Sequence, residues 1–259
     1  MTGMTRRILW INPVGTPMWD QEIASLLQQE AMPGTYVEAR SLPRGPHHLE
    51  YLSYDAQVVP DVLHTIRQAE REGFDAAVVG CFYDPGVREA REVAERIAVA
   101  FPCESCVMLA ATLGDRFSVI VGREKWIPAM RENVWRYGME RRLASFRAVG
   151  LGVHDFQRDP PETERRLLAS ARAAVDQDGA EVIILGCTIE FGFFRSLQSQ
   201  LGVPVLDATV TPFKVAELLA ELKQRFGWLP SKVGGFESPP PHEVESWILP
   251  QYEAGAGRS

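Results

Sequence analysis

Several features are scarce in this sequence of 259 residues, and each scarcity excludes a class of protein. Its four cysteines are too few for a disulfide-based fold of this length, and a reducing cytoplasm keeps such residues as thiols. No apolar run approaches the roughly 20 residues that a membrane helix needs. The apolar run Ile8–Ile11, which follows Arg6 and Arg7, is too short for a signal peptide. We therefore expect a cytoplasmic protein without a membrane partner.

Positive charge is also in short supply. The chain has 27 Lys and Arg against 34 Asp and Glu, which gives a formal net charge of -7. This acidic balance argues against a nucleic-acid partner. Hydrophobic residues, in contrast, make up 46% of the chain, enough for one large or two modest globular domains.

Two cysteines stand in matching places. Cys81 ends the stretch Phe74–Cys81, and Cys187 ends the stretch Ala180–Cys187. Each stretch reads as an apolar strand followed by glycine and then cysteine, and the two lie about a hundred residues apart. This weak internal repeat predicts a pseudo-symmetric enzyme with one thiol on each side of a shared cleft.

The segments around these cysteines alternate between strand and helix patterns, which predicts an α/β fold with mainly parallel sheets. The predicted strands are Arg7–Asn12, Thr35–Arg40, Phe74–Gly80, Phe117–Val121, Ser145–Val149, Val182–Leu185 and Val203–Leu206. The predicted helices are Gln57–Glu72, one from Asp84-Pro85 to Ile97, Lys125–Tyr137, Glu162–Gln177 and one opened by Thr211 and ended by Gly227.

The placement of both cysteines suits acid–base chemistry. A thiolate is the reactive form of cysteine, and a helix N-terminus stabilises its negative charge. Cys81 lies three residues before Asp84, which we interpret as a helix cap, and Thr188–Phe194 after Cys187 could begin another helix. Ligands of parallel α/β sheets bind beyond the carboxyl ends of the strands, where both thiols fall. The alternative is that the cysteines are small core residues.

Five stretches together resemble the aspartate/glutamate/hydantoin racemase superfamily, and most closely its hydantoin and allantoin racemase branch. The resemblance extends from about Arg7 to Phe226. The stretches that carry it are Ile11–Pro13, Gly80–Gly86, Gly114–Ser118, Tyr137–Ala144 and Gly186–Thr188.

The resemblance implies a cofactor-independent racemase built from two pseudo-symmetric α/β domains, with the active site between them. The second domain of that family is inserted into the first. We accordingly expect one domain at 1–111 plus 212–259, with a C-terminal tail at 228–259, and an inserted domain at 112–211. Homo-oligomers are common in the family, and the aromatic tail is consistent with one.

The mechanism that the resemblance implies uses Cys81 and Cys187 as a pair. One acts as thiolate base and the other as thiol acid, and the roles exchange for the opposite enantiomer. The oxygen of the carbanion needs hydrogen-bond donors, and the candidates are the backbone amides after the cysteines. They belong to Phe82, Tyr83, Thr188 and Ile189.

The residues beside the cysteines favour a neutral ring, such as a 5-substituted hydantoin or allantoin, over a zwitterionic amino acid. Phe82 and Tyr83 follow the first cysteine. The second is followed by Thr188, Ile189 and Glu190, where a histidine would be common in glutamate racemases. Thr188 could bind the substrate through its hydroxyl or cap a helix. Asn12 could bind a substrate carbonyl or amide, or form a turn. The branch usually has asparagine where this chain has Val14.

Other interpretations stay open at this point. Glu190 is an unusual acid beside the second cysteine; it either is a solvated or capping carboxylate, or contacts the substrate and supports a cysteine-dependent isomerase, hydrolase or decarboxylase. An aspartate or glutamate racemase and a non-catalytic binding protein are further alternatives. His47 and His48 form a solvated loop or a flap over the substrate.

No metal site is expected from the remaining cysteines. Cys103 and Cys106 have the spacing of half a zinc site, but neither a second pair nor suitable histidines lie nearby. We expect them to line a strand and its exit.

Overall fold

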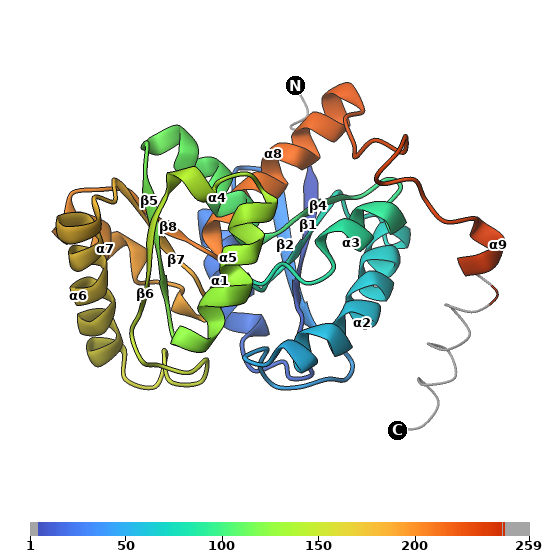
Figure 1. Ribbon diagram of the computed structural model, residues 1–259. Coiled ribbons are helices and arrows are strands. Elements are labelled where there is room, and N and C mark those ends of the chain that lie inside the picture. Colours follow the sequence, from blue (N-terminus) through green and yellow to red (C-terminus); the bar gives the residue numbers. More distant parts are fainter. Residues whose placement is uncertain (1–4, 245, 247–259) are drawn as a thin grey trace.

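Two parallel sheets form the framework of the protein, as Figure 1 shows. The structure, a computed structural model, describes residues 5–244 and 246. The strand orders are β2-β1-β3-β4 and β6-β5-β7-β8, so the same topology occurs twice. The strands are β1 Arg6–Asn12, β2 Thr35–Ser41, β3 Ala76–Val79, β4 Ala98–Ala100, β5 Phe117–Val121, β6 Leu143–Ala148, β7 Val182–Leu185 and β8 Val205–Asp207. The predicted α/β class with two pseudo-symmetric parallel sheets is confirmed.

Helices cover the faces of both sheets (Figure 1). They are α1 Asp20–Glu30, α2 Leu52–Arg71, α3 Val87–Val93, α4 Pro102–Leu113, α5 Ile127–Arg136, α6 Pro160–Asp178, α7 Phe194–Leu201, α8 Val210–Phe226 and α9 Pro241–Glu243. The described residues also form three short 3-10 helices: η1 Glu124–Trp126, η2 Glu140–Arg142 and η3 Thr188–Glu190. We call the part built on β1–β4 the first unit and the part built on β5–β8 the second unit.

The strands that carry the two cysteines are the most deeply buried. All residues of β3 and β7 are buried, because each strand lies inside its sheet with neighbours on both edges and helices over the faces. Their continuous apolar sequences, Ala-Ala-Val-Val and Val-Ile-Ile-Leu, follow from that position. The backbone that leads to each cysteine is therefore held in place by a buried strand.

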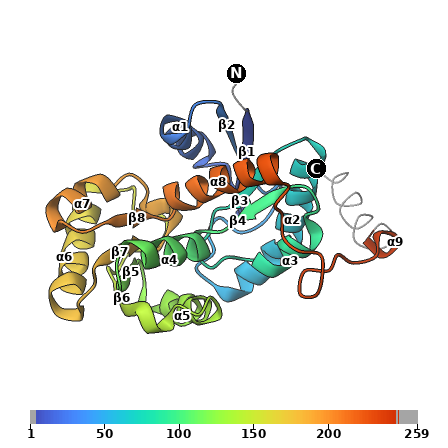
Figure 2. The same ribbon diagram turned by 90° about the horizontal axis from the view of Figure 1, so that it is seen from above.

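Two long segments lie along the seam between the units, as the view in Figure 2 shows. The helix α8 packs against β1, β3 and β4, so the chain returns to the first sheet after completing the second. The helix α4 packs against β5 and β7 of the second sheet and also against α8. Side chains from both units consequently merge into one large core cluster.

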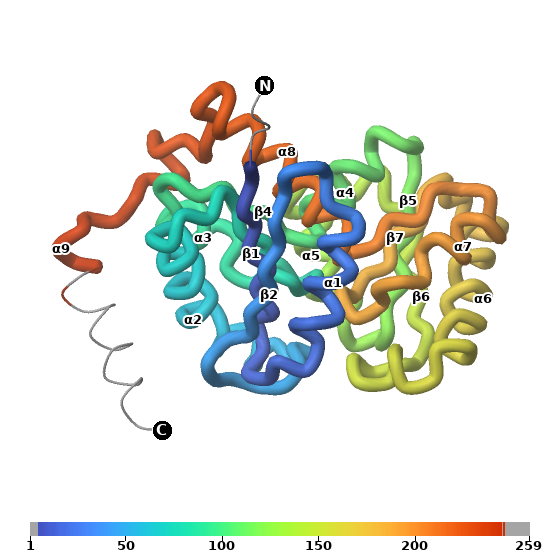
Figure 3. Tube along the Cα trace, turned by 180° about the vertical axis from the view of Figure 1, so that it is seen from behind, coloured from blue at the N-terminus to red at the C-terminus, as the bar shows by residue number. Residues whose placement is uncertain are grey.

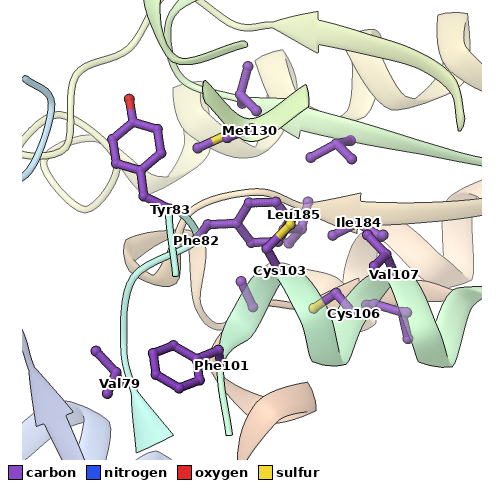
Figure 4. Packing of buried hydrophobic residues seen from close by; sticks show 14 of the residues in the cluster. Val79, Phe82, Tyr83, Phe101, Cys103, Cys106, Val107, Met130, Ile184 and Leu185 are labelled. Atoms are coloured by element: carbon purple, nitrogen blue, oxygen red, sulfur yellow. The ribbon is translucent and has the colours of Figure 1, made fainter. Parts of the chain in front are cut away.

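The structure corrects two local predictions. The helix after Cys81 begins at Val87 rather than at Asp84-Pro85, because Asp84 and Gly86 both have positive φ angles, 51° and 70°. Cys103 and Cys106 lie on α4, which was not predicted, and not on a strand. Figure 4 shows both of them on this helix among buried side chains. The strand of that region is the short β4 before it.

The segment after α8 crosses the first unit and leads to α9, on the side away from the second unit (Figure 3). Lys232 donates hydrogen bonds to the carbonyls of Arg91 and Glu92 at the end of α3. The aromatic tail residues Trp247 and Tyr252 lie outside the described residues. Within the described part of the chain, no helix has the length and apolar character that crossing a bilayer requires.

Candidate active site

A cavity at the carboxyl ends of the central strands brings the two cysteines together. Cys81, after β3, and Cys187, after β7, both contribute to its wall and are half-buried there. The surrounding space is about 680 Å³ including the open mouth, which is in the usual range of small-molecule sites. Its other lining residues are Asn12, Pro13, Val14, Thr16, Trp19, His47, His48, Leu49, Glu50, Gly80, Phe82, Tyr83, Trp126, Met130, Val153, Gly186, Thr188 and Ile189.

The glycine before each cysteine is required by packing. A Cβ atom on Gly80 would lie 2.4 Å from the indole ring of Trp10, and one on Gly186 would lie 2.8 Å from a methyl group of Val119. Real Cβ atoms do not approach other atoms so closely. The repeated Gly-Cys pattern thus arises because the backbone before each cysteine packs too closely against a neighbouring strand to allow a side chain.

Burial favours the neutral thiol at both cysteines. It raises the pKa of Cys81 well above the ordinary value, and the charges of Asp55 and Cys187 add to this effect. Burial also raises the pKa of Cys187, with a further contribution from Glu190. At neutral pH both groups are therefore predominantly protonated, and forming one thiolate beside the other costs energy.

Backbone amides oppose this effect at each sulfur. The amide of Tyr83 faces the Cys81 sulfur, and the amides of Ile189 and Glu190 face the Cys187 sulfur, which lowers the pKa of each thiol. The amides of Phe82 and Thr188 donate no hydrogen bond to backbone carbonyls within the described residues. The four amides considered for the carbanion oxygen thus divide into two that face sulfur and two that are free of backbone partners.

The side chain of Asn12 is held in one orientation at the cavity wall. The Trp10 indole donates to Asn12 Oδ1 at 2.6 Å, and Asn12 Nδ2 donates to Asp20 Oδ1 at 2.5 Å. Asp20 is fixed in turn by the hydroxyl and amide of Ser41. Asn12 then has a second N–H, besides the one donated to Asp20, that suits a carbonyl oxygen of a ligand.

The residues next to the cysteines have mixed roles. Phe82 is almost wholly buried and, in Figure 4, points toward Leu185 and Cys103 in the core. The Thr188 hydroxyl donates to the Gly80 carbonyl at 3.1 Å, so it ties one cysteine loop to the other. Tyr83 and Ile189 also belong to the cavity wall.

Glu190 is the one predicted site residue that does not line the cavity. It is fully buried, and the backbone amides of Cys187 and Gly186 face its carboxyl group. Burial raises the pKa of this carboxyl well above its ordinary value, which favours the neutral form. It is accordingly not a solvated carboxylate. Its backbone amide donates to the Cys187 carbonyl at 3.0 Å, and a negative charge on its carboxyl raises the pKa of Cys187.

The loop that carries Cys81 is held by the second unit. The Asp84 carboxylate accepts from the amides of Cys103 and Glu104 at the start of α4, and from the Tyr137 hydroxyl at 2.6 Å. Asn133 of α5 donates to the Tyr83 carbonyl at 2.6 Å. Asp84 therefore acts as a helix cap, as the sequence predicted. The helix that it caps is α4, however, and not α3, which follows it in the sequence.

A second loop, residues 47–50 of the first unit, lines the cavity and contacts the second unit. Its residue Glu50 accepts from Arg123 at 2.6 Å and from the Val153 amide at 3.1 Å, so the first unit bridges to the second. The ring of His48 lies 5.5 Å from that of His154, also across the units. The sequence singled out the two histidines of this loop as a possible flap. It gave no signal for Glu50, whose partners are distant in sequence.

Few charged side chains line the cavity. Among the described residues that line it there is no Lys or Arg, and burial lowers the pKa of His48, which leaves the imidazole neutral. No group of three or more His, Cys, Asp or Glu suited to a metal ion occurs in the described part of the chain. The site consists of two thiols, oriented amides and an otherwise largely apolar surface.

This arrangement defines a class of α/β protein that has two parallel sheets and one cysteine from each unit at a shared cavity. The sequence model of the Asp/Glu/hydantoin racemase family matches residues 8–214, and the chain belongs to this family. The recognition made from the motifs is thereby confirmed.

Named relatives support the same grouping. The chain is 36% identical over 219 residues to a hydantoin racemase of a Pseudomonas species, covering 85% of this chain and 88% of that protein. It is 38% identical over 205 residues to a hydantoin racemase of Rhizobium meliloti, covering 79% and 83%. An allantoin racemase structure from Klebsiella pneumoniae superposes with a TM-score of 0.85 at 28% identity, covering 91% and 94%.

Proposed function

We propose that this protein is a cofactor-independent racemase that inverts C5 of a 5-substituted hydantoin or of allantoin. The observation that carries the proposal is that one thiol from each unit borders a single cavity. Two acid–base groups on opposite sides of a carbon can remove its proton from one face and return a proton to the other. Relatives named hydantoin racemase and a neighbour named allantoin racemase support this reaction.

The reaction balances without a further reagent. The thiolate of one cysteine takes the C5 proton, and the electron pair left on carbon delocalises onto the adjacent carbonyl oxygen. The thiol of the other cysteine then protonates the opposite face. The free amides of Phe82 and Thr188 and the spare N–H of Asn12 are the proposed donors to that oxygen, each contributing roughly 3 kcal/mol.

The wall of the cavity supports a neutral ring over an amino acid. A zwitterionic substrate needs a partner for its carboxylate, and the described lining offers neither Lys nor Arg. Trp19, Trp126 and Met130 form an apolar part of the wall, which suits an aromatic or thioether substituent at C5. We therefore propose that hydantoins with apolar substituents are better substrates than allantoin.

Incubation of single enantiomers in deuterated water tests the reaction. We expect 5-benzylhydantoin to lose optical rotation faster than allantoin, with one deuterium entering C5 in each inversion, and no reaction of aspartate or glutamate. A sample without enzyme corrects for spontaneous racemisation. Release of carbon dioxide or of a ring-opened acid without inversion would instead point to decarboxylase or hydrolase chemistry.

Replacing either cysteine tests the two-base mechanism. We expect Cys81→Ala and Cys187→Ala each to lower the rate of racemisation by at least a thousandfold, because each variant keeps only one acid–base group. Cys106→Ala is the matched control, since this thiol is buried on α4 and away from the cavity wall. Near-normal racemisation in either of the first two variants contradicts the mechanism.

Three further parts of the proposal concern the whole protein. The return of α8 to the first sheet supports a domain at 1–111 plus 212–259 around an inserted domain at 112–211. The packing of α4 on the second sheet favours a first crossing nearer to residue 101. A cytoplasmic location and a homo-oligomeric assembly stay predictions.

A further inference from the structure

One histidine in the wall of the cavity is held in a single tautomer. His48, in the loop before α2, lines the cavity together with both cysteines. Its Nδ1 atom accepts a hydrogen bond from the Glu50 amide at 3.3 Å. A neutral imidazole has one acceptor nitrogen and one donor nitrogen, so this bond places the proton of His48 on Nε2. Burial lowers the pKa of His48, which favours the neutral form.

The His48 ring is also held in place by aromatic side chains from both units. Its centroid lies 5.6 Å from that of Tyr54 and 5.9 Å from that of Tyr51, and these two tyrosines contact each other at 5.1 Å. The ring of His154, from the second unit, lies at 5.5 Å with an angle of 85° between the two planes. These contacts limit the rotation of the imidazole, so the direction of its N–H is fixed before a ligand binds.

The Nε2–H group of His48 is available to a ligand. It donates to no group among the described residues, where the hydrogen bond of this ring runs through Nδ1. The Nε2 atom is also not among the enclosed polar atoms that lack a partner in that part of the chain, so it is accessible. An oriented donor in an otherwise largely apolar wall is the kind of group that fixes the orientation of a small ligand.

The polar groups of a hydantoin ring leave one partner for this donor. The ring has two carbonyls, at C4 and C2, and two N–H groups. The C4 oxygen, beside the reacting C5, is the proposed acceptor for Asn12 and the free backbone amides. His48 cannot accept from a ring N–H, because its acceptor nitrogen is already bonded to the Glu50 amide. The C2 carbonyl, at the far edge of the ring, is the acceptor that remains.

We propose that His48 is a substrate-binding residue that donates from Nε2 to the C2 carbonyl of the ring. This inference rests on the proposed function in so far as it takes a hydantoin-type ring as the ligand. Held at C4 by one set of donors and at C2 by His48, the ring is recognised as a cyclic ureide. A cyclic amide without the C2 carbonyl leaves the His48 N–H without its partner in the closed site, so such rings are rejected.

Binding of the parent ring tests this contact without turnover. Hydantoin and 2-thiohydantoin differ only in the atom on C2, and sulfur is the poorer acceptor. Isothermal titration calorimetry with the full-length wild-type protein and His48→Phe gives the dissociation constants. We expect the constant for hydantoin to rise at least fivefold in His48→Phe and that for 2-thiohydantoin to change less than twofold. The constant for 4-thiohydantoin, which keeps the C2 oxygen, should rise as much as that for hydantoin.

Two further variants separate the donor from the packing of the ring. His48→Gln keeps a side-chain N–H without the imidazole, and its preference for hydantoin over 2-thiohydantoin should be at least twofold greater than that of His48→Phe. His154→Phe is the matched control, because His154 packs on the same imidazole but does not line the cavity. It should leave both constants within twofold of the wild-type values. His48→Leu repeats the measurement if phenylalanine perturbs folding.

The kinetics of racemisation give a second readout. Negative charge develops on the C4 oxygen, so a bond at C2 stabilises the substrate and the transition state to a similar extent. With 5-benzylhydantoin as substrate, His48→Phe should raise KM at least fivefold and change kcat less than twofold. A large loss of kcat with unchanged KM would contradict a binding role at C2.

The outcomes distinguish this inference from the proposed function. Equal effects of His48→Phe on hydantoin and 2-thiohydantoin, or no effect on either, overturn the inference, as does a wild-type protein that does not bind hydantoin. Absence of racemisation beside the expected binding pattern overturns the proposed function and leaves the His48 contact intact. Racemisation without that binding pattern supports the proposed function and overturns the contact.

Discussion

Single residues determine how closely the backbone of the site packs against its neighbours, and Gly80 is the clearest case. Its Cα lies so near Trp10 that a methyl group would overlap the indole, which also holds Asn12. We expect Gly80→Ala to lower the free energy of unfolding by about 1–3 kcal/mol, as overpacked cores do, and to weaken substrate binding through Asn12.

Urea denaturation and the Michaelis constant for the best hydantoin check this expectation. Gly235→Ala is the control, because Gly235 also lacks a positive φ but a Cβ there meets only the end of Arg88 at 3.8 Å. Equal stability of the Gly80 and Gly235 variants would show that the strand end relaxes around the extra methyl.

The sequence identifies residues that act through a local pattern and misses those placed by distant contacts. Cys81 and Cys187 follow recognisable strands, so their convergence at one cavity could be predicted from topology. Glu50 belongs to no motif, and its partners lie on other elements. Glu190 stands beside a motif, but its burial depends on the packing of the second unit.

At the scale of elements, the Cys81 loop depends on a helix of the other unit. Asp84 caps α4 through the amides of Cys103 and Glu104. We expect Asp84→Asn to cost about 1–3 kcal/mol of stability, since the amide nitrogen would face donors. Racemisation should also fall, because the loop that presents Cys81 loses its anchor.

Thermal unfolding and initial rates measure both effects. Asp159→Ala provides the comparison, since Asp159 caps α6 and lies away from the cavity wall. It should lose about 1 kcal/mol of stability and keep its rate. Similar rates in the two variants would refute a role for the cap in positioning Cys81.

Elements with a distinct periodicity or flanking glycine could be predicted, and those without could not. The predictions for α6, β5 and β7 agree with the structure to within two residues at each end. The helix α4 was missed because it is buried on most sides between the second sheet and α8, so its sequence lacks an amphipathic pattern. The prediction that Asp84-Pro85 opens the next helix was wrong, because the Asp84 carboxylate accepts from the Cys103 amide of α4 instead.

At the scale of the whole molecule, Glu50 links the two units at the wall of the cavity. It is buried, and its bonds to Arg123 and to the Val153 amide cross the seam. Closing the units excludes water and strengthens every electrostatic interaction inside the cavity. We expect Glu50→Gln to lower kcat/KM about tenfold while global stability changes little, because the variant populates a more open arrangement.

Arg123→Gln decides whether Glu50 acts as this link or as a substrate contact. If the link matters, Arg123→Gln should lower kcat/KM to a similar extent, the double variant should be no worse than either single one, and wild-type activity should fall as salt screens the pair. Glu162→Gln removes two ion pairs within α6, with Arg165 and Arg166, and should leave kcat/KM unchanged. Full activity of Arg123→Gln beside a defective Glu50→Gln would mean that Glu50 binds the substrate itself, since it lines the cavity as well as the seam.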